Sequence, residues 1–569
     1  MHWKFPKFDI KKIENISQKY NIPSLHAKIM ISRGLEDEHV IDSYFNKKLS
    51  DLYDPFLMKD MNKAVERIIH NIQNKVPIFI AGDYDVDGMT SASILYLGIE
   101  ALGGNAITYI PHRKKDGRGL STNAIDLAEQ SGSNLIITCD CGINQISQIN
   151  YANLKNIDVV ISDHHIAQSL LPNAYAIINP KQSECKYPFK DLSSAGVVWK
   201  ILLGIVQKIN SPPKIMFNLL DLVALGTAAD LVPLKNENRI LVHYGLKSMN
   251  EKMRLGIREL FKVANITIKE NISVTDLLFI LAPRINAVGR LGDANKAVKL
   301  LTTNDRSIAA SLAMSLNNSN KKRQNIQKLV YEDACSMIYN TIDLEKERII
   351  VLDSKDWHQG VIGIIASKLK EKFCRPVIII AYDSNGCGKG SGRSIHGLDL
   401  YATLFKTKDL LFEYGGHPMA LGFSIDEKNV KKFKRSILSI VNHTISKESL
   451  NPVLNLDVDM QIIDINQRLV SFLKKMSPFG QGNKYPKFGV MDVNVIGDPK
   501  INRNGNHIRF QIKQNKKLID VVGFGLADYY KILIMGKKID IACSIENTIW
   551  RGKEFIQLNA KDIRLSDLN

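Results

Sequence analysis

The chain has 569 residues, of which 45% are hydrophobic, so it is long enough for three or four domains and too apolar to be intrinsically disordered. Its formal net charge of +18 favours a polyanionic partner, although a composition rich in Lys, Asn and Ile produces part of this excess without any selection for binding. Seven scattered cysteines without a CxxC pair argue against a disulfide framework or a zinc ribbon. No apolar run is long enough to span a membrane, and we expect a soluble cytoplasmic protein.

The first half of the chain predicts a helical preface followed by an α/β domain. Residues 1–50 show helical periodicity and form a predicted helical N-terminal segment. Between 51 and 306, strand-like and helix-like runs alternate, which indicates a mostly parallel sheet with both faces covered. The expected strands have the sequences VPIFIAGD, NAITYIPH, NLIITCD, IDVVISDHH and AYAIINP. Amphipathic helices are expected at 122–130 and 145–154.

The segment 78–93, IFIAGDYDVDGMTSAS, carries the strongest chemical signal. Asp83, Asp85 and Asp87 follow a short apolar strand, at the point where an α/β sheet binds its ligands. Three carboxylates placed together repel one another unless cations lie between them, and carboxylate oxygens suit Mg²⁺ and Mn²⁺. The alternatives are a solvated acidic turn and a calcium loop of the EF-hand type. The latter lacks its bidentate Glu here, because position 94 is Ile.

Other strands of this domain also end in acids or histidines. Asp140 follows LIITC, and His164 and His165 follow DVVIS with Asp163 between. Asp230 closes LLDLVALGTAAD, which we expect to be a helix and a turn. Because parallel strands place their carboxyl ends on one edge of the sheet, Asp140 and His164 are expected to converge with Asp85 and Asp87 of the first motif.

The middle of the chain predicts two connecting pieces. Arg284, Asn286 and Arg290 occur in what we interpret as a glycine-bearing loop between apolar segments. Residues 307–345 lack Pro and Gly over most of their length and predict a connecting helix between domains. An ordinary surface helix explains the same composition nearly as well.

A second α/β unit is expected at 346–448. Its segment 386–397 holds five glycines with Lys389, Ser391 and Arg393, and glycine-rich backbone beside basic residues is typical of phosphate binding. The spacing is not that of a P-loop, and a plain hairpin is the structural alternative.

Residues 449–569 predict a small β-barrel of the OB type. Short strand-like runs alternate with Gly, Asn and Lys turns, and from 451 onward 18 Lys and Arg stand against 12 Asp and Glu. Four aromatic residues are candidates for stacking on bases, although core positions suit most of them better: Phe488, Phe510, Phe524 and Trp550.

Taken in order, these motifs resemble the DHH phosphoesterase superfamily and, within it, the RecJ single-stranded-DNA exonucleases. GDYDVDG, CDCG, SDHH and ALGTAADLVPL match the four motifs of the phosphoesterase domain. Five further stretches are similar to RecJ segments in the same order: APRINAVGRLGDA, WHQGVIGIIASKL, GSGRS, GGHPMALGF and SPFGQGN. One turn departs from the pattern. Where the family usually shows an EGYG-like sequence after IPHR, this chain has Asp116-Gly117-Arg118-Gly119.

The resemblance implies a two-metal phosphodiesterase that uses Mn²⁺ or Mg²⁺. Asp140 is then the candidate bridge between the two ions. Asp87, His164 and Asp230 complete one site, and Asp85, with Asp83, holds the other. His165 is expected to contact the scissile phosphate as a donor or proton shuttle, with a role in orienting its neighbours as the alternative. Residues expected to bind the DNA end and its phosphates are Arg113, Arg284, Asn286, Arg290, Ser391, Arg393 and His417.

The implied activity is degradation of single-stranded DNA from a free 5′ end to mononucleotides, in DNA repair and recombination. A monomer working with a single-strand-binding protein and a helicase is the implied context. One alternative is a DHH phosphodiesterase that acts on small nucleotides or short oligonucleotides, but such chains lack a basic third unit like residues 449–569. The other is a DNA-binding relative that has lost its metals, but here Asp85, Asp87, Asp140 and Asp230 are all present.

Overall fold

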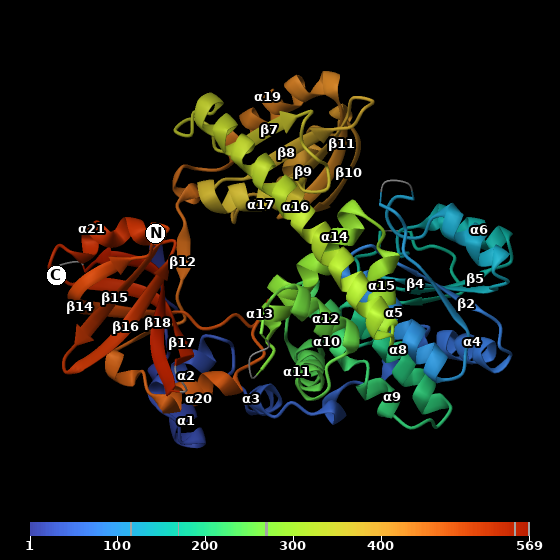
Figure 1. Ribbon diagram of the computed structural model, residues 1–569, viewed down its shortest axis with the longest axis horizontal. Coiled ribbons are helices and arrows are strands. Elements are labelled where there is room, and N and C mark those ends of the chain that lie inside the picture. The colour runs from blue at the N-terminus through green and yellow to red at the C-terminus, as the bar shows by residue number, and fades with distance from the viewer. Residues whose placement is uncertain (114–115, 169, 268–270, 551–552, 567–569) are drawn as a thin grey trace.

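A computed structural model describes residues 1–113, 116–168, 170–267, 271–550 and 553–566, and it shows three lobes arranged around a central gap (Figure 1). The lobes are an α/β domain, a second α/β domain reached through a long helix, and a β-barrel against which the N-terminal helices pack. This is the architecture that the sequence predicts.

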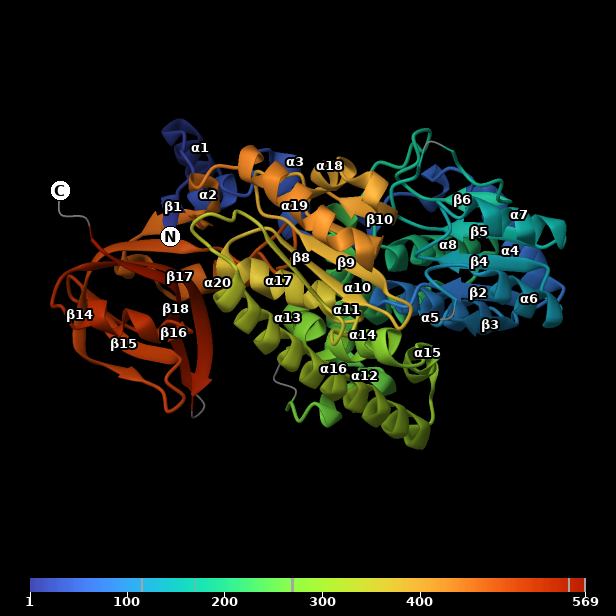
Figure 2. The ribbon, with the colours of Figure 1, turned by 90° about the horizontal axis from the view of Figure 1, so that it is seen from above.

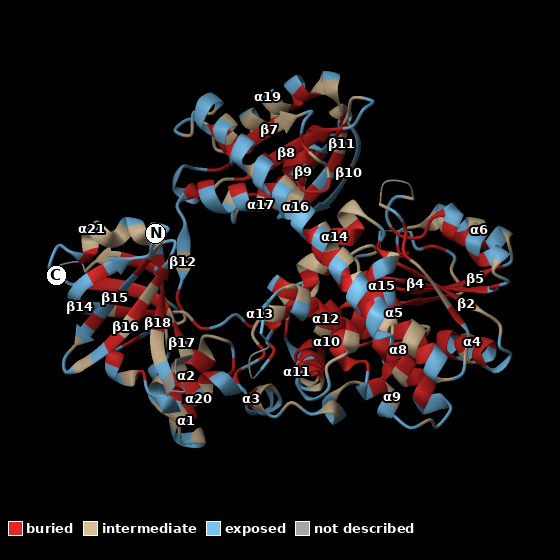
Figure 3. Ribbon diagram, viewed as in Figure 1, coloured by how far each residue is buried: buried red, intermediate tan, exposed pale blue. Residues whose placement is uncertain are grey.

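The first domain is built on a parallel sheet of order β3-β2-β4-β5-β6. Its strands are β2 (Ile78–Gly82), β3 (Ala106–Tyr109), β4 (Leu135–Cys139), β5 (Asp158–Ser162) and β6 (Ala176–Ile178). All pairings are parallel, so every strand delivers its carboxyl end to the same edge. The strands are almost entirely buried, as Figure 3 shows for β2, β4 and β5.

Alternate residues of these strands face two different helix layers. Ile78 and Ile80 of β2 belong to a large core, whereas Phe79 between them belongs to a smaller one on the other face. The smaller core is covered by α6 (Thr122–Gln130) and α7 (Ile146–Leu154). The larger core is covered by α4 (Met61–Gln73), α5 (Val86–Ala101), α8 (Ser194–Lys208) and α10 (Leu220–Ala229), and it continues into α11 (Asn236–Glu251) and α12 (Leu255–Val263). The remaining elements of this lobe are α9 (Lys214–Phe217), α13 (Val274–Asp276), the π-helical turn Leu277–Leu281, α14 (Ala282–Leu291) and α15 (Asn295–Thr302).

The connecting helix α16 (Arg306–Thr341) is shared by two cores. Near its start, Ala313 and Leu316 pack into the first domain, and near its end, Ala334 and Ile338 pack into the second. Figure 2 shows α16 running beneath both lobes. Because its two halves pack into different cores, this helix connects the two α/β domains.

The second α/β domain has a mixed sheet of order β10-β11-β9-β8-β7. Its strands are β7 (Ile350–Ser354), β8 (Val377–Tyr382), β9 (Cys387–Arg393), β10 (Leu411–His417) and β11 (Ala420–Asp426). Helices α16 and α17 (Ile362–Phe373) cover one face, and α18 (Leu400–Phe405) and α19 (Glu427–Thr444) cover the other.

The third lobe is a closed barrel. Strands β14 (Phe488–Ile501), β15 (His507–Gln514), β16 (Lys517–Phe524), β18 (Lys553–Leu565) and β17 (Ile539–Trp550) follow one another, and β17 pairs back onto β14. The short strand β13 (Val458–Met460) pairs in parallel with the first residues of β14, and α20 (Gln467–Lys475) and α21 (Tyr530–Leu533) lie against the barrel. Phe488 and Phe510 are core residues, Phe524 is exposed, and the side chain of Trp550 lies outside the described residues.

The N-terminal segment packs against this C-terminal barrel. Strand β1 (His2–Lys4) pairs in parallel with β12 (Val453–Asn455), and the Trp3 indole donates to Asp562 at 2.7 Å. Helices α1 (Ile10–Tyr20), α2 (Ser24–Ile31) and α3 (Glu38–Phe45) follow, and Ile29 of α2 enters the barrel core. The two ends of the chain therefore meet in one lobe (Figure 1).

The loop predicted around Arg284 and Arg290 is wrong, and the hairpin alternative for segment 386–397 is confirmed. The predicted loop around Arg284 and Arg290 is helix α14, and Gly289 lies in it because a Cβ would clash with the carbonyl of Tyr84. Most of the glycine-rich segment is strand β9, which pairs antiparallel with β8, and a Cβ on Gly390 would clash with the ring of Phe423. In both places glycine permits close packing rather than a turn.

Candidate metal centre and phosphate cavity

The three aspartates after β2 are held in different environments. Asp85 caps the start of α5 and accepts a hydrogen bond from the Gly88 amide at 3.1 Å. Asp87, in the first turn of α5, is fully buried and accepts from two amides at the N-terminus of α8, Ser194 at 2.7 Å and Ala195 at 2.9 Å. Asp83 is also buried and accepts from the Tyr84 amide. The three carboxylates thus point in directions set by the backbone.

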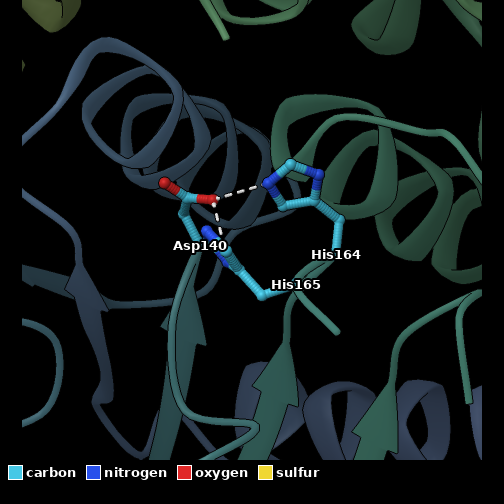
Figure 4. A group of neighbouring side chains, drawn as sticks. All are labelled: Asp140, His164 and His165. Atoms are coloured by element: carbon cyan, nitrogen blue, oxygen red, sulfur yellow. Dashed lines mark ion pairs between the residues drawn. The ribbon is translucent and has the colours of Figure 1, made fainter. Parts of the chain in front are cut away.

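Asp140 and the two histidines meet at the ends of β4 and β5. His164 Nε2 lies 3.1 Å from Asp140 Oδ1 and 3.6 Å from Asp230 Oδ2, and His165 Nδ1 lies 3.8 Å from the same Asp140 oxygen (Figure 4). Asp140 has a φ of 65°, a left-handed backbone conformation that is uncommon outside glycine. The predicted convergence of strand ends is therefore present in the structure.

Asp163 orients His165, a role that the sequence reasoning did not assign. Its buried carboxylate accepts from the amides of Ile143, His164 and His165, and it pairs with His165 Nδ1 at 2.7 Å. Burial is the largest single effect and raises the pKa of Asp163, but the hydrogen bond and charge of His165 together with the backbone amides of His165 and Ile143 outweigh it, which leaves this pKa below its ordinary value. The residue stood in the quoted SDHH motif, so its position at a strand end was the available signal.

The acids and histidines form three overlapping groups whose ligand atoms lie within 4.8 Å of one another. The groups are Asp83–Asp85–Asp140, Asp87–His164–Asp230 and Asp140–His164–His165. Asp140 and His164 each belong to two of them. Mixed carboxylate and imidazole ligands around a shared carboxylate are suited to a pair of divalent cations.

Two observations show that this edge of the sheet fits a cation. Asp140 Oδ1 and His164 Nε2 are buried without a well-formed hydrogen bond among the described residues, although they lie close together. Burial and neighbouring carboxylates raise the pKa of Asp87 and Asp140 far above the ordinary value, and raise that of Asp230 to about 7. Burial lowers the pKa of His164 to about 4, so its imidazole is neutral and can act as a ligand.

A cavity of about 840 Å³ lies between the two α/β domains, and Arg113 in its lining lies over the ring of Tyr84, the residue between Asp83 and Asp85. Four of the predicted phosphate-binding residues line it: Arg113, Arg290, Ser391 and Arg393. Lys389, which the sequence reasoning left out of the site, also lines it. Arg284, Asn286 and His417 lie outside the lining; Arg284 instead donates to Asn317 at 3.1 Å.

Arg393 reaches this cavity without an acidic partner. Its guanidinium donates to the hydroxyls of Ser367 and Ser391, at 3.1 and 3.2 Å, and to the Gly392 carbonyl at 2.7 Å. Burial lowers the pKa of Arg393, and no carboxylate among the described residues counteracts this effect. A half-buried cation without a counter-ion is typical of an anion-binding site.

The barrel has a groove of about 530 Å³ on the outer surface of its strands. Phe524 and Phe555 expose 56% and 47% of their surface there, and Arg509 lies beside them. Exposed aromatic rings next to a guanidinium are suited to stacking on nucleic-acid bases.

Comparison with known proteins agrees with this architecture. The DHH family N-terminal domain matches residues 77–227, the DHHA1 domain residues 346–443 and the RecJ OB domain residues 456–562. The single-stranded-DNA-specific exonuclease RecJ of Bacillus subtilis is 34% identical over 568 residues, which cover 100% of this chain and 71% of that protein. The protein of the same name from Haemophilus influenzae is 33% identical and covers 90% and 92%.

A solved structure shows the same fold. The crystal structure of RecJ in complex with Mn²⁺ from Thermus thermophilus superposes with a TM-score of 0.84 at 25% identity, covering 100% of this chain and 80% of that one. In the part of the chain that the structure describes, no helix is both long and apolar enough to cross a membrane.

The parallel sheet with acids and histidines at its carboxyl edge, coupled to the second α/β domain, places the molecule among the DHH phosphoesterases. Because the similarity extends through the barrel and over nearly the whole chain, the chain belongs to the RecJ family.

Proposed function

We propose that this protein is a metal-dependent exonuclease that degrades single-stranded DNA from its 5′ end to mononucleotides, in DNA repair and recombination. The observation that carries the proposal is the shared Asp140, which joins two groups of potential metal ligands next to a cationic cavity. Relatives named single-stranded-DNA-specific exonucleases, and a structural relative that contains Mn²⁺, support the substrate and the cofactor.

In this proposal two Mn²⁺ or Mg²⁺ ions bind the predicted residues. Asp87, His164 and Asp230 would hold one ion and Asp85 with Asp83 the other, and Asp140, which belongs to the second group and lies 3.1 Å from His164 of the first, would serve both. When bound, the ions supply a water-derived nucleophile at neutral pH and stabilise charge on the leaving oxygen. His165, held through Nδ1 by Asp163, presents Nε2 as a donor to the reacting phosphate. Burial lowers the pKa of His165, but Asp163 outweighs burial and the net pKa is raised, which favours the donor form.

The decisive experiment compares end labels. Digestion of 5′-labelled single-stranded DNA with Mn²⁺ should release labelled mononucleotides immediately, whereas a 3′ label should persist in shortening strands. Single-stranded RNA and duplex DNA serve as control substrates. Faster hydrolysis of a dinucleotide than of a long strand would instead favour the small-substrate alternative.

The seven free cysteines support the cytoplasm as the compartment, and we further propose a monomer that works with a single-strand-binding protein and a helicase.

We expect Arg393→Ala to reduce the preference for a 5′ phosphate. The guanidinium has no acidic partner among the described residues and lines the cavity beside the metal centre, so it is free to bind a terminal phosphate. A charge-assisted contact of this kind contributes about 1.5–3 kcal/mol, and KM for phosphorylated strands should rise about ten- to a hundred-fold. The measurement is the ratio of kcat/KM on 5′-phosphorylated and 5′-hydroxyl strands. An unchanged ratio would assign Arg393 to domain packing instead.

We expect Phe524→Ala to weaken the binding of long strands selectively. Stacking of a base on an exposed ring contributes roughly 1–3 kcal/mol, so Kd should rise about five- to a hundred-fold for strands that reach the barrel. Strands too short to reach it should bind as before. Ile496→Ala, which removes an exposed apolar side chain of β14 outside the groove, is the control. Equal losses on short and long strands would show that the groove does not bind DNA.

A further inference from the structure

The turn at 116–119, where the chain departs from its family's usual sequence, places Arg118 at the metal centre. Arg118 Nε donates to Asp83 Oδ2 at 2.8 Å, and one terminal nitrogen lies 3.3 Å from His165 Nε2. Asp83 is a member of the acidic group that contains Asp140. The guanidinium therefore lies between one set of potential metal ligands and the histidine that faces the substrate.

The backbone holds this arginine in a defined position. The side-chain amide of Gln145 donates to the carbonyls of Arg118, at 3.2 Å, and Leu120, at 2.9 Å, and accepts from the Leu120 amide at 2.8 Å. Gly119, at φ 76°, packs so closely on Gln145 that a Cβ would clash with this amide. Asp116, on the other side, accepts from the Tyr109 hydroxyl. A turn fixed at both ends is suited to presenting one side chain to a ligand.

Most of the guanidinium remains available for binding. Its side chain is 58% exposed, while Asp83, its partner, is 1% exposed. Among the described residues the guanidinium has two contacts, Nε with Asp83 and one terminal nitrogen with His165, which leaves at least three of its five N–H donors without a protein partner there. Burial lowers the pKa of Arg118, but Asp83 and the neighbouring acids outweigh burial and raise it, so the group stays charged.

We propose that Arg118 binds a non-bridging oxygen of the scissile phosphodiester, and that Asp83 is the positioning residue that holds the guanidinium there. The inference rests on the proposed function, because it assumes that a phosphodiester occupies the centre formed by Asp85, Asp140 and the histidines. A planar fork with free donors matches a phosphate better than a lysine ammonium does. In this assignment Asp83, which belongs to the acidic group proposed for the second ion, also positions the guanidinium.

The test is a thermodynamic cycle that needs no turnover. Binding of a 5′-phosphorylated, fluorescein-labelled oligothymidylate is measured by anisotropy in EDTA, for native protein and Arg118→Gln. Three strands are compared: an all-phosphate strand, one with a neutral methylphosphonate at the first linkage, and one with it at the fourth. The repulsion between the acids and the strand acts in both proteins and cancels in the ratio.

If Arg118 binds the scissile phosphate, Arg118→Gln should lower the affinity for the all-phosphate strand about ten-fold. It should lower the affinity for the strand with the neutral first linkage less than two-fold. The neutral fourth linkage should leave the ten-fold loss intact. Lys181→Gln is the control, because it removes a positive charge that acts on Asp230 and His164 of the metal centre. Its affinity should fall by the same factor for all three strands. Arg118→Lys, which keeps the charge without the fork, should show an intermediate ratio and serves if the glutamine variant fails to fold.

An equal loss on all three strands in both Arg118 variants would show that Arg118 only anchors the turn, and would overturn the proposal. Failure of the proposed function would look different. Native protein that neither binds nor digests single-stranded DNA would refute the proposed function itself, whereas native binding without the first-linkage effect refutes only the assignment of Arg118.

Discussion

Asp140→Asn is expected to abolish hydrolysis while leaving the protein folded. Asp140 is common to two groups of potential metal ligands, so both ions lose a ligand when its charge is removed. The loss should be at least about a thousand-fold in kcat, on the order of several kcal/mol of transition-state stabilisation. Asparagine is a better replacement than alanine, because residue 140 has a left-handed backbone that asparagine tolerates and alanine does not.

The same variant has an opposite effect on the metal-free protein. Burial and the surrounding acids raise the pKa of Asp140, which means that its charge is destabilising in the folded state at neutral pH. In EDTA, Asp140→Asn should therefore melt at or above the native temperature, and Mn²⁺ should stabilise the native protein but not the variant. A folded Asp140→Asn protein with substantial activity at millimolar Mn²⁺ would rule out the bridging role.

Lys200→Met is expected to destabilise the first domain more than any surface substitution. Lys200 and Glu237 are both fully buried and form an ion pair of 2.7 Å between α8 and α11. Glu237 also accepts from the Tyr53 amide and the Tyr187 hydroxyl. Removing the lysine leaves a buried carboxylate without a counter-charge, at a cost of about 3–5 kcal/mol. For a domain of this size the melting temperature should fall by roughly 6–20 °C.

The double variant Lys200→Met/Glu237→Gln provides the control. A neutral amide can still accept from the Tyr187 hydroxyl and needs no counter-charge, so most of the lost stability should return. Calorimetry of the two variants and the native protein measures the difference. A single variant that melts within about 2 °C of the native protein would show that water or another group compensates Glu237. The first amides of α8 bind Asp87, so the position of Asp87 depends on the folding of α8. The single variant should therefore lose activity at the temperature at which it unfolds.

The periodicity of the sequence was sufficient to predict the parallel sheet and the acids and histidines at its carboxyl edge. Apolar runs followed at once by acids or histidines predict buried strands with polar ends, and parallel strands leave no choice of edge. The meeting of Asp140 and His164 therefore follows from local patterns combined with one rule of topology, whereas Asp230 reaches His164 from the end of helix α10. The closed barrel and the connecting helix α16 were predictable for a similar reason, since strand length and helical periodicity are local properties.

What the sequence determined by itself was the set of elements and the residues that carry chemistry; tertiary packing alone decided how distant segments meet. Gly289 and Gly390 look like turn signals, but they belong to a helix and a strand because another chain segment lies against each of them. The pairing of β1 with β12, and the reach of Arg118 to Asp83, join residues far apart in the chain. Such contacts depend on complementary surfaces that form only after folding, so no local sequence pattern predicts them.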